Sequence, residues 1–366
     1  MELTFYLPTK IIMGKNCVVQ NSKLFTKTGK NALVITYPVN EKNGSIDDIR
    51  NALEEQGLKY SITLEAPVNP EIKEMKKFGE LASDAGADMI IGIGGGSVLD
   101  TAKTAAVLAV NKMPVDELYA NVYKNKPLPV IAIPTTAGTG SEVTPYAVLT
   151  IKDKNTKKSF GNEDLMSPVY AFLDARYTET LPPQVAADCA VDALSHGLEG
   201  FLSKKSNWVS DMIGITIFKN FSDCADSLQK REFTFEQREK LLFNAALSGI
   251  MINHMRTLAV HAMGYPLSIN RRLSHGCACG ILLGAFMEYI YPDCARKARQ
   301  MYESLGVKDT KDFSGLISSI LRYKENYSPE ELMQYTEESF DAASAKPNPR
   351  GVDKQAVLEI YMNALM

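Results

Sequence analysis

The first half of the chain alternates continuously apolar runs with segments that carry apolar residues at helical spacing. The apolar runs predict strands at residues 32–37, 60–64, 89–93, 129–133 and 169–173. The segments between them predict helices at residues 45–57, 70–85 and 98–110, with Ser45 as the N-cap of the first. Because the strands lack polar alternation and helices separate them, the pattern indicates an α/β fold with a parallel sheet covered on both faces.

A change of pattern near residue 180 divides the chain. Just before it, an apolar run at residues 147–151 and the polar sequence KDKNTKK after it predict a hairpin arm. From residue 184 onward only helical patterns follow, at residues 184–203, 207–228, 234–256, 276–291, 293–305, 311–322, 328–344 and 353–365. We therefore expect an α/β dinucleotide-binding domain over residues 1–180 and an all-helical domain over residues 181–366.

Two polar loops follow predicted strands in the first domain. The sequence GIGGGS (92–97) leads from a strand directly into a helix, and consecutive glycines let the backbone approach a ligand closely. The N–H groups and dipole of a helix start favour a phosphate, although the spacing is not G-x-G-x-x-G and a merely tight turn is the alternative. The second loop, PTTAGTGSE (134–142), also lies at the carboxyl end of a strand, where open α/β sheets bind ligands.

Four residues of the second half form a candidate metal-binding set. Asp192 and His196 are four residues apart in VDALSHGLEG, so on a helix they share one face. His261 and His275 lie in apolar, glycine-containing surroundings, where burial of an unpaired imidazole would be costly. One carboxylate and three imidazoles suit Fe(II) or Zn(II), and the alternative is a set of unrelated core histidines.

The composition narrows the class of protein. The chain of 366 residues has a net charge of -3, which provides no basic excess for a nucleic acid or an anionic membrane. Six scattered cysteines do not make a disulfide framework, and the CxC pair Cys277 and Cys279 is interpreted as small buried apolar side chains, with soft metal ligands as the alternative. The N-terminus shows no signal-peptide pattern and no apolar run is long enough to span a bilayer, so we expect a cytoplasmic protein.

Four long motifs resemble the iron-containing (group III) alcohol dehydrogenases. They are GGGSVLDTAK (94–103), PTTAGTGSEVT (134–144), DALSHGLEG (192–200) and the pair VHAMGYPL and SHG (260–276). The resemblance covers almost the whole chain. It implies the dehydroquinate synthase-like architecture of that family: a dinucleotide-binding α/β domain, a helical metal- and substrate-binding domain, and a cleft between them. It also implies a homodimer or higher homo-oligomer and hydride transfer between a nicotinamide and a short-chain alcohol or aldehyde whose oxygen the metal holds.

Carried over by position, the resemblance assigns individual residues. The metal, Fe(II) or Zn(II), would be held by Asp192, His196, His261 and His275. NAD(H) or NADP(H) would be contacted by Tyr37, Asn69, Gly95, Gly96, Ser97, Val98, Leu99, Thr135, Thr136, Ala137, Gly138, Thr139, Lys158, Thr178 and Thr180.

The chain departs from the family pattern at three places. Tyr37 replaces an acidic residue that accepts the ribose hydroxyls in many members, which leaves NADP(H) open. Tyr265 replaces a second histidine near the nicotinamide, so the tyrosine is the candidate for proton transfer or for ordering water. Arg256 stands where glycine is common, and together with Arg271 and Arg272 it raises the alternative of an anionic substrate, although an arginine facing solvent or a local carboxylate explains each one as well.

Two further functions remain as alternatives. A lyase of the dehydroquinate-synthase type shares the architecture but needs a cluster of basic residues for a phosphorylated substrate. A non-catalytic assembly protein would be expected to have lost some metal or cofactor residues.

Overall fold

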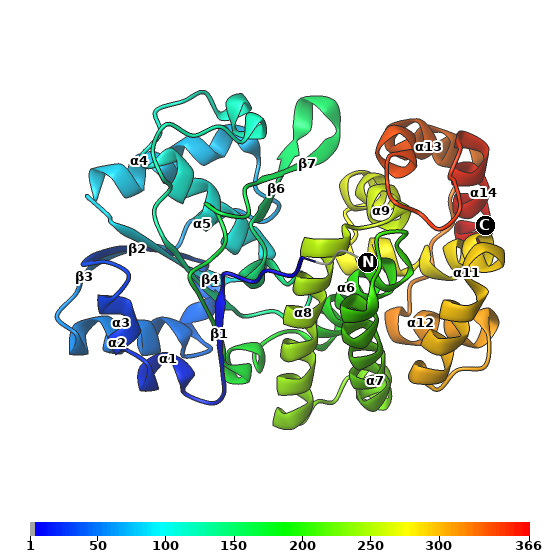
Figure 1. The fold of residues 1–366 in the computed structure, drawn as a ribbon, viewed down its shortest axis with the longest axis horizontal. Helices are drawn as coiled ribbons and strands as arrows, with labels where there is room; N and C mark the ends of the chain where they lie inside the picture. Colours follow the sequence, from blue (N-terminus) through cyan, green and yellow to red (C-terminus); the bar gives the residue numbers. More distant parts are fainter. Residues whose placement is uncertain (1–3) are drawn as a thin grey trace. The chain divides into compact units, whose positions relative to one another are not determined.

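The computed structural model describes residues 4–366, which form two compact units. One unit is Tyr6–Leu181, and the other is Pro182–Met366 together with Thr4 and Phe5. The first contains a sheet and helices and the second is built of helices, as Figure 1 shows. The predicted fold class is confirmed.

The first unit is organised around a six-stranded parallel sheet with the order β1-β8-β5-β4-β2-β3. Its strands are β1 (Lys10–Met13), β2 (Asn31–Thr36), β3 (Lys59–Thr63), β4 (Met89–Gly94), β5 (Val130–Pro134) and β8 (Tyr170–Leu173). The sequence pattern did not predict β1, a partly exposed edge strand of four residues. The chain runs outward from β2 to β3 and then returns to β4 on the other side of β2. The strand order therefore reverses between β2 and β4, and such a point favours a ligand site at the carboxyl ends.

Helices cover both faces of this sheet (Figure 1). They are α1 (Cys17–Gln20), α2 (Lys23–Thr26), α3 (Ser45–Glu55), α4 (Met75–Asp84) and α5 (Gly96–Leu108). Along β2, Leu33 belongs to the apolar core that includes α4 and α5, whereas Val34 belongs to the core that includes α3. Burial on alternating sides explains why the strands read as continuously apolar.

Two local features refine the sequence prediction for this unit. The N-cap of α3 is Gly44, with φ at 80°, and not Ser45, because the side chain of Asn43 accepts hydrogen bonds from Ser45 N (3.0 Å) and Ser45 Oγ (2.6 Å). The predicted hairpin arm is confirmed as β6 (Tyr146–Ile151), which pairs antiparallel with β7 (Thr156–Gly161).

The second unit contains nine helices among its described residues. They are α6 (Pro183–Leu202), α7 (Trp208–Lys230), α8 (Phe235–Met255), α9 (Ala259–Asn270), α10 (His275–Gly280), α11 (Leu283–Leu305), α12 (Thr310–Leu321), α13 (Pro329–Ser344) and α14 (Lys354–Leu365). The sequence pattern missed α9, which is buried on nearly all sides and contains Pro266, so it lacks the polar face by which a surface helix is detected. The predicted helix 276–291 is divided between α10 and α11, and α11 continues past a kink at Cys294.

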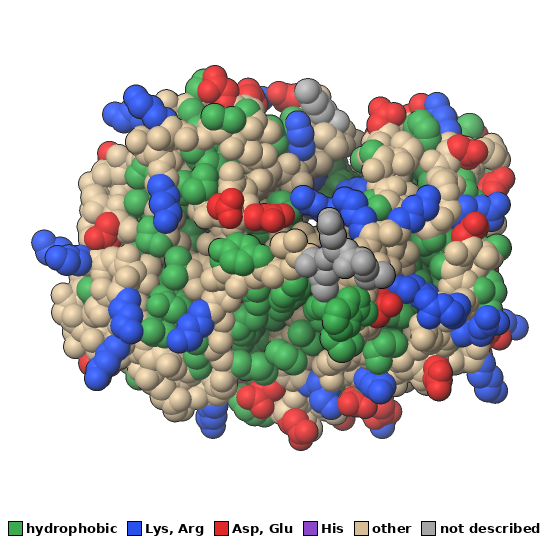
Figure 2. Space-filling view, viewed as in Figure 1, with side chains coloured by type: hydrophobic (Ala, Val, Ile, Leu, Met, Phe, Trp, Pro, Cys, Tyr) green, Lys and Arg blue, Asp and Glu red, His purple; other side chains and the backbone are tan. Residues whose placement is uncertain are grey.

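Charged side chains of both signs occur over each unit on the face drawn in Figure 2. No helix within residues 4–366 combines the length and the apolar character needed to cross a membrane.

Candidate functional site

The buried helix α6 supplies two of the predicted metal ligands. Asp192 and His196 are 3% and 5% exposed, and their spacing of four residues places them on one face. Burial acts to raise the pKa of the Asp192 carboxyl, but the imidazoles of His196, His275 and His261 outweigh it, and the pKa lies well below its usual range. The carboxylate form of Asp192 is therefore stabilised by the imidazoles around it.

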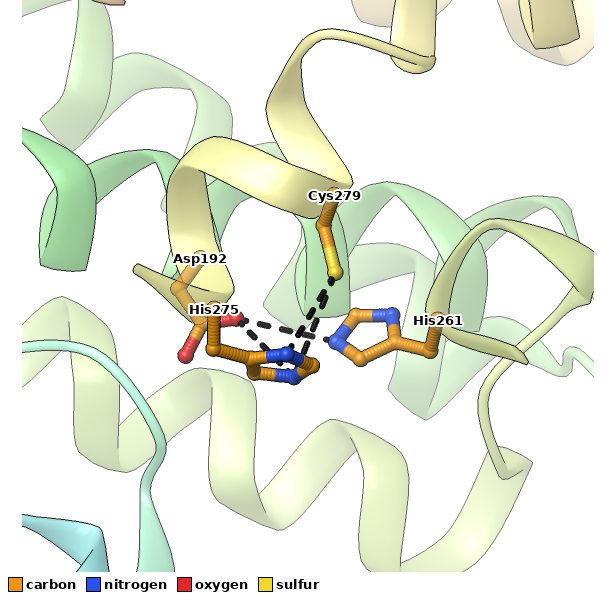
Figure 3. Close-up of side chains that lie close together, drawn as sticks. All are labelled: Asp192, His261, His275 and Cys279. Atoms are coloured by element: carbon orange, nitrogen blue, oxygen red, sulfur yellow. Dashed lines mark hydrogen bonds and ion pairs between the residues drawn. The ribbon is translucent and has the colours of Figure 1, made fainter. Parts of the chain in front are cut away.

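Helices α9 and α10 bring the other histidines to Asp192. Its Oδ1 atom lies 3.7 Å from Nε2 of His261 and 3.8 Å from Nε2 of His275. Cys279 joins this group, with Sγ 3.9 Å from Nε2 of His275, and one donor atom of each of these four residues lies within 4.8 Å of the others (Figure 3). His196 lies beside the group, with its ring stacked on that of His261 at a centroid distance of 4.2 Å.

Two atoms of this cluster show that it fits a cation. Asp192 Oδ1 and His261 Nε2 are buried and have no hydrogen-bond partner within residues 4–366. A buried carboxylate oxygen and a ring nitrogen that converge without partners would be costly unless a cation satisfies both. Carboxylate and imidazole are donors that Fe(II) and Zn(II) accept.

The approach of α10 to α6 depends on Gly276. A Cβ atom at this position would lie 1.8 Å from the carbonyl oxygen of Asp188, so only glycine permits the contact. Ser274 caps α10 by accepting a hydrogen bond from Cys277 N (3.3 Å), and its hydroxyl donates to Oδ2 of Asp188 (2.5 Å). The start of α10 is thus held one helical turn from Asp192, which brings His275 to the cluster.

Glu199 is a candidate site residue that the sequence analysis did not single out. It is fully buried on α6, and its Oε2 atom contacts Nδ1 of His261 while its Oε1 atom accepts the His261 backbone N–H (3.3 Å). This contact leaves Nε2 of His261 facing Asp192. In metal sites, a carboxylate that binds one ring nitrogen of a histidine orients the other nitrogen toward the metal in the same way. Burial acts to lower the pKa of His261, but Glu199 and Asp192 raise it to about 9. The position of Glu199 three residues after His196 was the available sequence signal.

The structure also places Tyr265 and the fourth histidine of the chain, His254. Tyr265 on α9 stacks on His275 at a centroid distance of 5.8 Å, which puts it at the edge of the cluster. His254 stacks instead on Phe5 and is not a member of the cluster.

The three arginines differ in their surroundings. Arg271 forms ion pairs with Glu331 (2.5 Å) and Glu325 (3.5 Å), which favours a structural role. Arg272 has a positive φ of 56°. Arg256 ends α8 with φ 65° and ψ 166°, a backbone region that only glycine adopts without strain.

Lys346 lies near Arg256 and the metal cluster. Its ammonium donates a hydrogen bond to Oγ1 of Thr257 (3.1 Å), just before α9. Burial lowers the pKa of Lys346, the Glu199 carboxylate opposes this effect, and Arg256 adds to it. The positive charges of Lys346 and Arg256 therefore interact near Glu199, the carboxylate that contacts His261.

In the first unit, several of the predicted cofactor residues follow β2, β4 and β5, the strands around the point where the strand order reverses. Asn69 N donates a hydrogen bond to Oγ of Ser97 (3.1 Å) at the start of α5. Tyr37 follows β2, and its hydroxyl donates to the carbonyl of Pro67 (2.9 Å). Burial raises the pKa of Tyr37 to about 12, although a hydrogen bond with Ser97 acts in the opposite direction.

The second loop lies against the glycine turn. Thr135 N donates to the carbonyl of Gly94 (3.1 Å), and a Cβ atom at Gly96 would lie 2.8 Å from the side chain of Thr139. A buried polar network joins this loop to α5, because Ser141 Oγ donates to Asp100 (2.7 Å) and accepts from Lys103 (2.7 Å). The network keeps both loops in register at the carboxyl edge of the sheet.

The remaining cofactor candidates have local partners. Val98 and Leu99 are buried, and their N–H groups donate to the Gly95 carbonyl within the turn. Lys158 lies over the ring of Tyr119 at 4.5 Å, while the neighbouring Lys157 contacts Oδ1 of Asn69 (2.9 Å). Thr136, Ala137 and Gly138 lie in the second loop. Thr178 and Thr180 follow β8, and the first of them is buried whereas the second is exposed.

Comparison with known proteins gives matches over both units. The family model described as iron-containing alcohol dehydrogenase matches residues 8–175, and the one described as Fe-containing alcohol dehydrogenase family, C-terminal, matches residues 186–365.

Individual relatives match over most of their length. The chain is 32% identical over 282 residues to Long-chain-alcohol dehydrogenase 1 of Geobacillus thermodenitrificans, covering 76% of this chain and 70% of the relative. It is 31% identical over 280 residues to Sulfoacetaldehyde reductase of Bilophila wadsworthia, covering 76% of this chain and 72% of the relative. A crystal structure of an iron-containing alcohol dehydrogenase from Thermotoga maritima superposes with a TM-score of 0.91 at 34% identity, covering 99% of both chains.

Proposed function

Because the chain belongs to the iron-containing alcohol dehydrogenase family, we propose that it holds Fe(II), or Zn(II), through Asp192, His196, His261 and His275. The reaction is hydride transfer between a nicotinamide cofactor and an alcohol or aldehyde. The N-terminal domain (1–180) would bind NAD(H) or NADP(H), and the C-terminal domain (181–366) would bind the metal and the substrate.

One observation carries the metal proposal. Oδ1 of Asp192 and Nε2 of His261 are buried, 3.7 Å apart, and have no hydrogen-bond partner within residues 4–366. A cation held between them would satisfy both atoms.

When bound, the metal would polarise a carbonyl oxygen or lower the pKa of an alcohol, and the nicotinamide would carry the hydride. Glu199 orients His261 so that Nε2 faces Asp192. The side chain of His275 is 27% exposed, whereas the side chains of Asp192 and His261 are buried, so the substrate would approach past His275. Tyr265 stacks on His275 and would exchange the substrate's proton with water.

The position of Tyr37 supports the use of both cofactors. A carboxylate at the end of β2 would bind the ribose hydroxyls of NAD(H) and repel the 2′-phosphate of NADP(H). Tyr37 has no such charge, and its hydroxyl is occupied by the Pro67 carbonyl. We therefore expect NADPH to be accepted as well as NADH.

A second candidate function is the reduction of an aldehyde that carries a carboxylate, sulfonate or phosphonate. Holding arginine at φ 65° and ψ 166° costs about 1–3 kcal/mol, so the presence of arginine at position 256, where glycine would be unstrained, supports a role for its charge. Lys346 lies close enough to Arg256 to interact with it. The similarity to a sulfoacetaldehyde reductase supports the same substrate class.

The substitution His261→Ala tests the main proposal. We expect loss of the bound metal and of nearly all aldehyde reduction, because the substitution removes one ligand together with its contact to Glu199. NADH binding, followed by quenching of its fluorescence, should remain because the cofactor residues lie in the other unit. Full turnover by a variant shown to be metal-free would overturn the proposal. A steady fall in NAD(P)H absorbance with an aldehyde would also exclude the lyase alternative, since such a lyase regenerates its cofactor in each turnover.

A further inference from the structure

We propose that Sγ of Cys279 is a fifth ligand of the metal ion, in addition to Asp192, His196, His261 and His275. The inference rests on the proposed function, because it concerns the same metal centre, and it adds a soft donor to a set of carboxylate and imidazole ligands.

The position of Cys279 on α10 places its sulfur on the metal-binding face. It follows His275 by four residues, so the two side chains are about 40° apart around the helix axis. Cys277 follows His275 by two residues and points about 160° away. Of the two cysteines in the CxC motif, only Cys279 belongs to the converging group of donors in Figure 3.

The distances are compatible with donors around a single ion. Metal–ligand bonds of about 2.0–2.3 Å would place neighbouring ligand atoms about 3–3.7 Å apart. Sγ lies 3.9 Å from both ring nitrogens of His275, and the Asp192 to histidine distances are 3.7 and 3.8 Å. The donor atoms of Asp192, His261, His275 and Cys279 all lie within 4.8 Å of one another, so a bound ion would have to draw the more distant of them together by up to about 1 Å.

The surrounding packing directs the sulfur to this place. Cys279 is fully buried, and a Cβ atom at Gly264 of α9 would lie 2.9 Å from Sγ. The glycine leaves room for the sulfur beside α9, one turn after His261. A larger residue at position 264 would push the thiol out of the group.

The two atoms of the cluster that lack a hydrogen-bond partner support a bound cation at the point toward which Sγ is directed. Asp192 and His261 are each 3% exposed, and Oδ1 and Nε2 have no hydrogen-bond partner within the described chain. In Figure 3 both point into the space that the Cys279 sulfur and the His275 ring also border.

A thiolate changes which metals the centre prefers. Thiolate donors favour Zn(II), whereas imidazole and carboxylate donors alone also suit Fe(II). Cys279 would therefore shift the preference of this chain toward zinc. Binding of the ion would release the thiol proton to solvent.

Cobalt substitution tests the proposal by spectroscopy and not by activity. The metal-free protein would be loaded with Co(II) under anaerobic conditions, and its near-ultraviolet absorption recorded for a thiolate-to-cobalt charge-transfer band. We expect the band in the unaltered protein and in Cys277→Ser, a matched control on the same helix, and its loss in Cys279→Ala. Affinity for Zn(II), measured by competition with a chelator, should weaken at least about tenfold in Cys279→Ala but not in Cys277→Ser.

The outcomes separate this inference from the proposed function. A cobalt protein without the band, or a band that persists in Cys279→Ala, would overturn sulfur ligation while leaving a metal-dependent dehydrogenase intact. Failure to bind any metal would overturn both. If Cys279→Ala does not fold, zinc X-ray absorption on the unaltered protein decides the question, since a sulfur ligand at about 2.3 Å is expected and nitrogen and oxygen alone would exclude it.

Discussion

Glu199 contacts His261 at two points, the ring nitrogen Nδ1 through Oε2 and the backbone N–H through Oε1 (3.3 Å). His261 is the third residue of α9, so this N–H is one of the donors that a helix start leaves unsatisfied. One buried carboxylate therefore caps α9 and sets which nitrogen of the imidazole faces Asp192.

We predict that Glu199→Gln weakens metal binding about 10–100-fold, because the neutral amide holds the imidazole less firmly and makes it a weaker donor. Metal content after dialysis against graded chelator concentrations measures the effect. Glu199→Ala should lower metal affinity further, since the N-terminus of α9 also loses its cap. Unchanged affinity in Glu199→Gln would show that the contact is only structural.

The close contact at Gly276 predicts that a larger residue at this position would destabilise the helical unit and weaken metal binding. Gly276→Ala would place Cβ 1.8 Å from a backbone carbonyl, so α10 must move away from α6, at a cost of about 2–3 kcal/mol or more. His275 moves with the helix, and metal affinity should fall as well. Gly315→Ala in the exposed part of α12 is the control: its Cβ meets no atom within 4 Å, and it should stabilise the chain by up to about 1 kcal/mol.

Cofactor preference should change with one side chain. Tyr37→Asp places a carboxylate at the end of β2, where it would accept the ribose hydroxyls and repel a 2′-phosphate. We expect kcat/KM for NADPH to fall at least about tenfold while that for NADH is kept or rises. Tyr37→Phe removes the hydrogen bond to Pro67 without adding charge, and it should leave the ratio of the two cofactors nearly unchanged.

Substitution of Arg256 distinguishes the two substrate classes. In Arg256→Gly the backbone at φ 65° and ψ 166° becomes unstrained, so stability should rise by about 1 kcal/mol. If the arginine binds substrate, kcat/KM for a sulfonate-bearing aldehyde should fall at least about tenfold, with a neutral aldehyde of the same length unaffected. Equal effects on both aldehydes would remove the anionic substrate from consideration.

The buried carboxyl of Glu142 should make stability depend on pH. Burial raises its pKa from 4.5 to about 7, so the folded chain binds more protons than the unfolded chain between these values. The free energy of unfolding therefore falls as pH rises from about 4.5 to about 7, by about 3 kcal/mol, and is level above that range. In urea denaturation, Glu142→Gln should be more stable than the unaltered protein at pH 8, and the difference should vanish near pH 4.5. A constant difference at all pH values would contradict the shift.

The sequence by itself determined the layered parallel sheet and part of the site. Strands such as 89–93 are buried on both sides, and a continuously apolar run reports that burial directly. The spacing of Asp192 and His196 defines one face of one helix, which is a local property. Helix α9 escaped detection because burial on nearly all sides removes the polar stripe that marks a helix.

Tertiary structure alone decided which residues of different helices meet. Spacing along α10 places Cys279, and not Cys277, on the face of His275, but only the docking of α10 through Gly276 brings that face to Asp192. Glu199 gains its role from His261, 62 residues away in the chain. Spacing along a helix fixes the face on which a side chain lies, but the distance between helices depends on the packing of residues far apart in sequence.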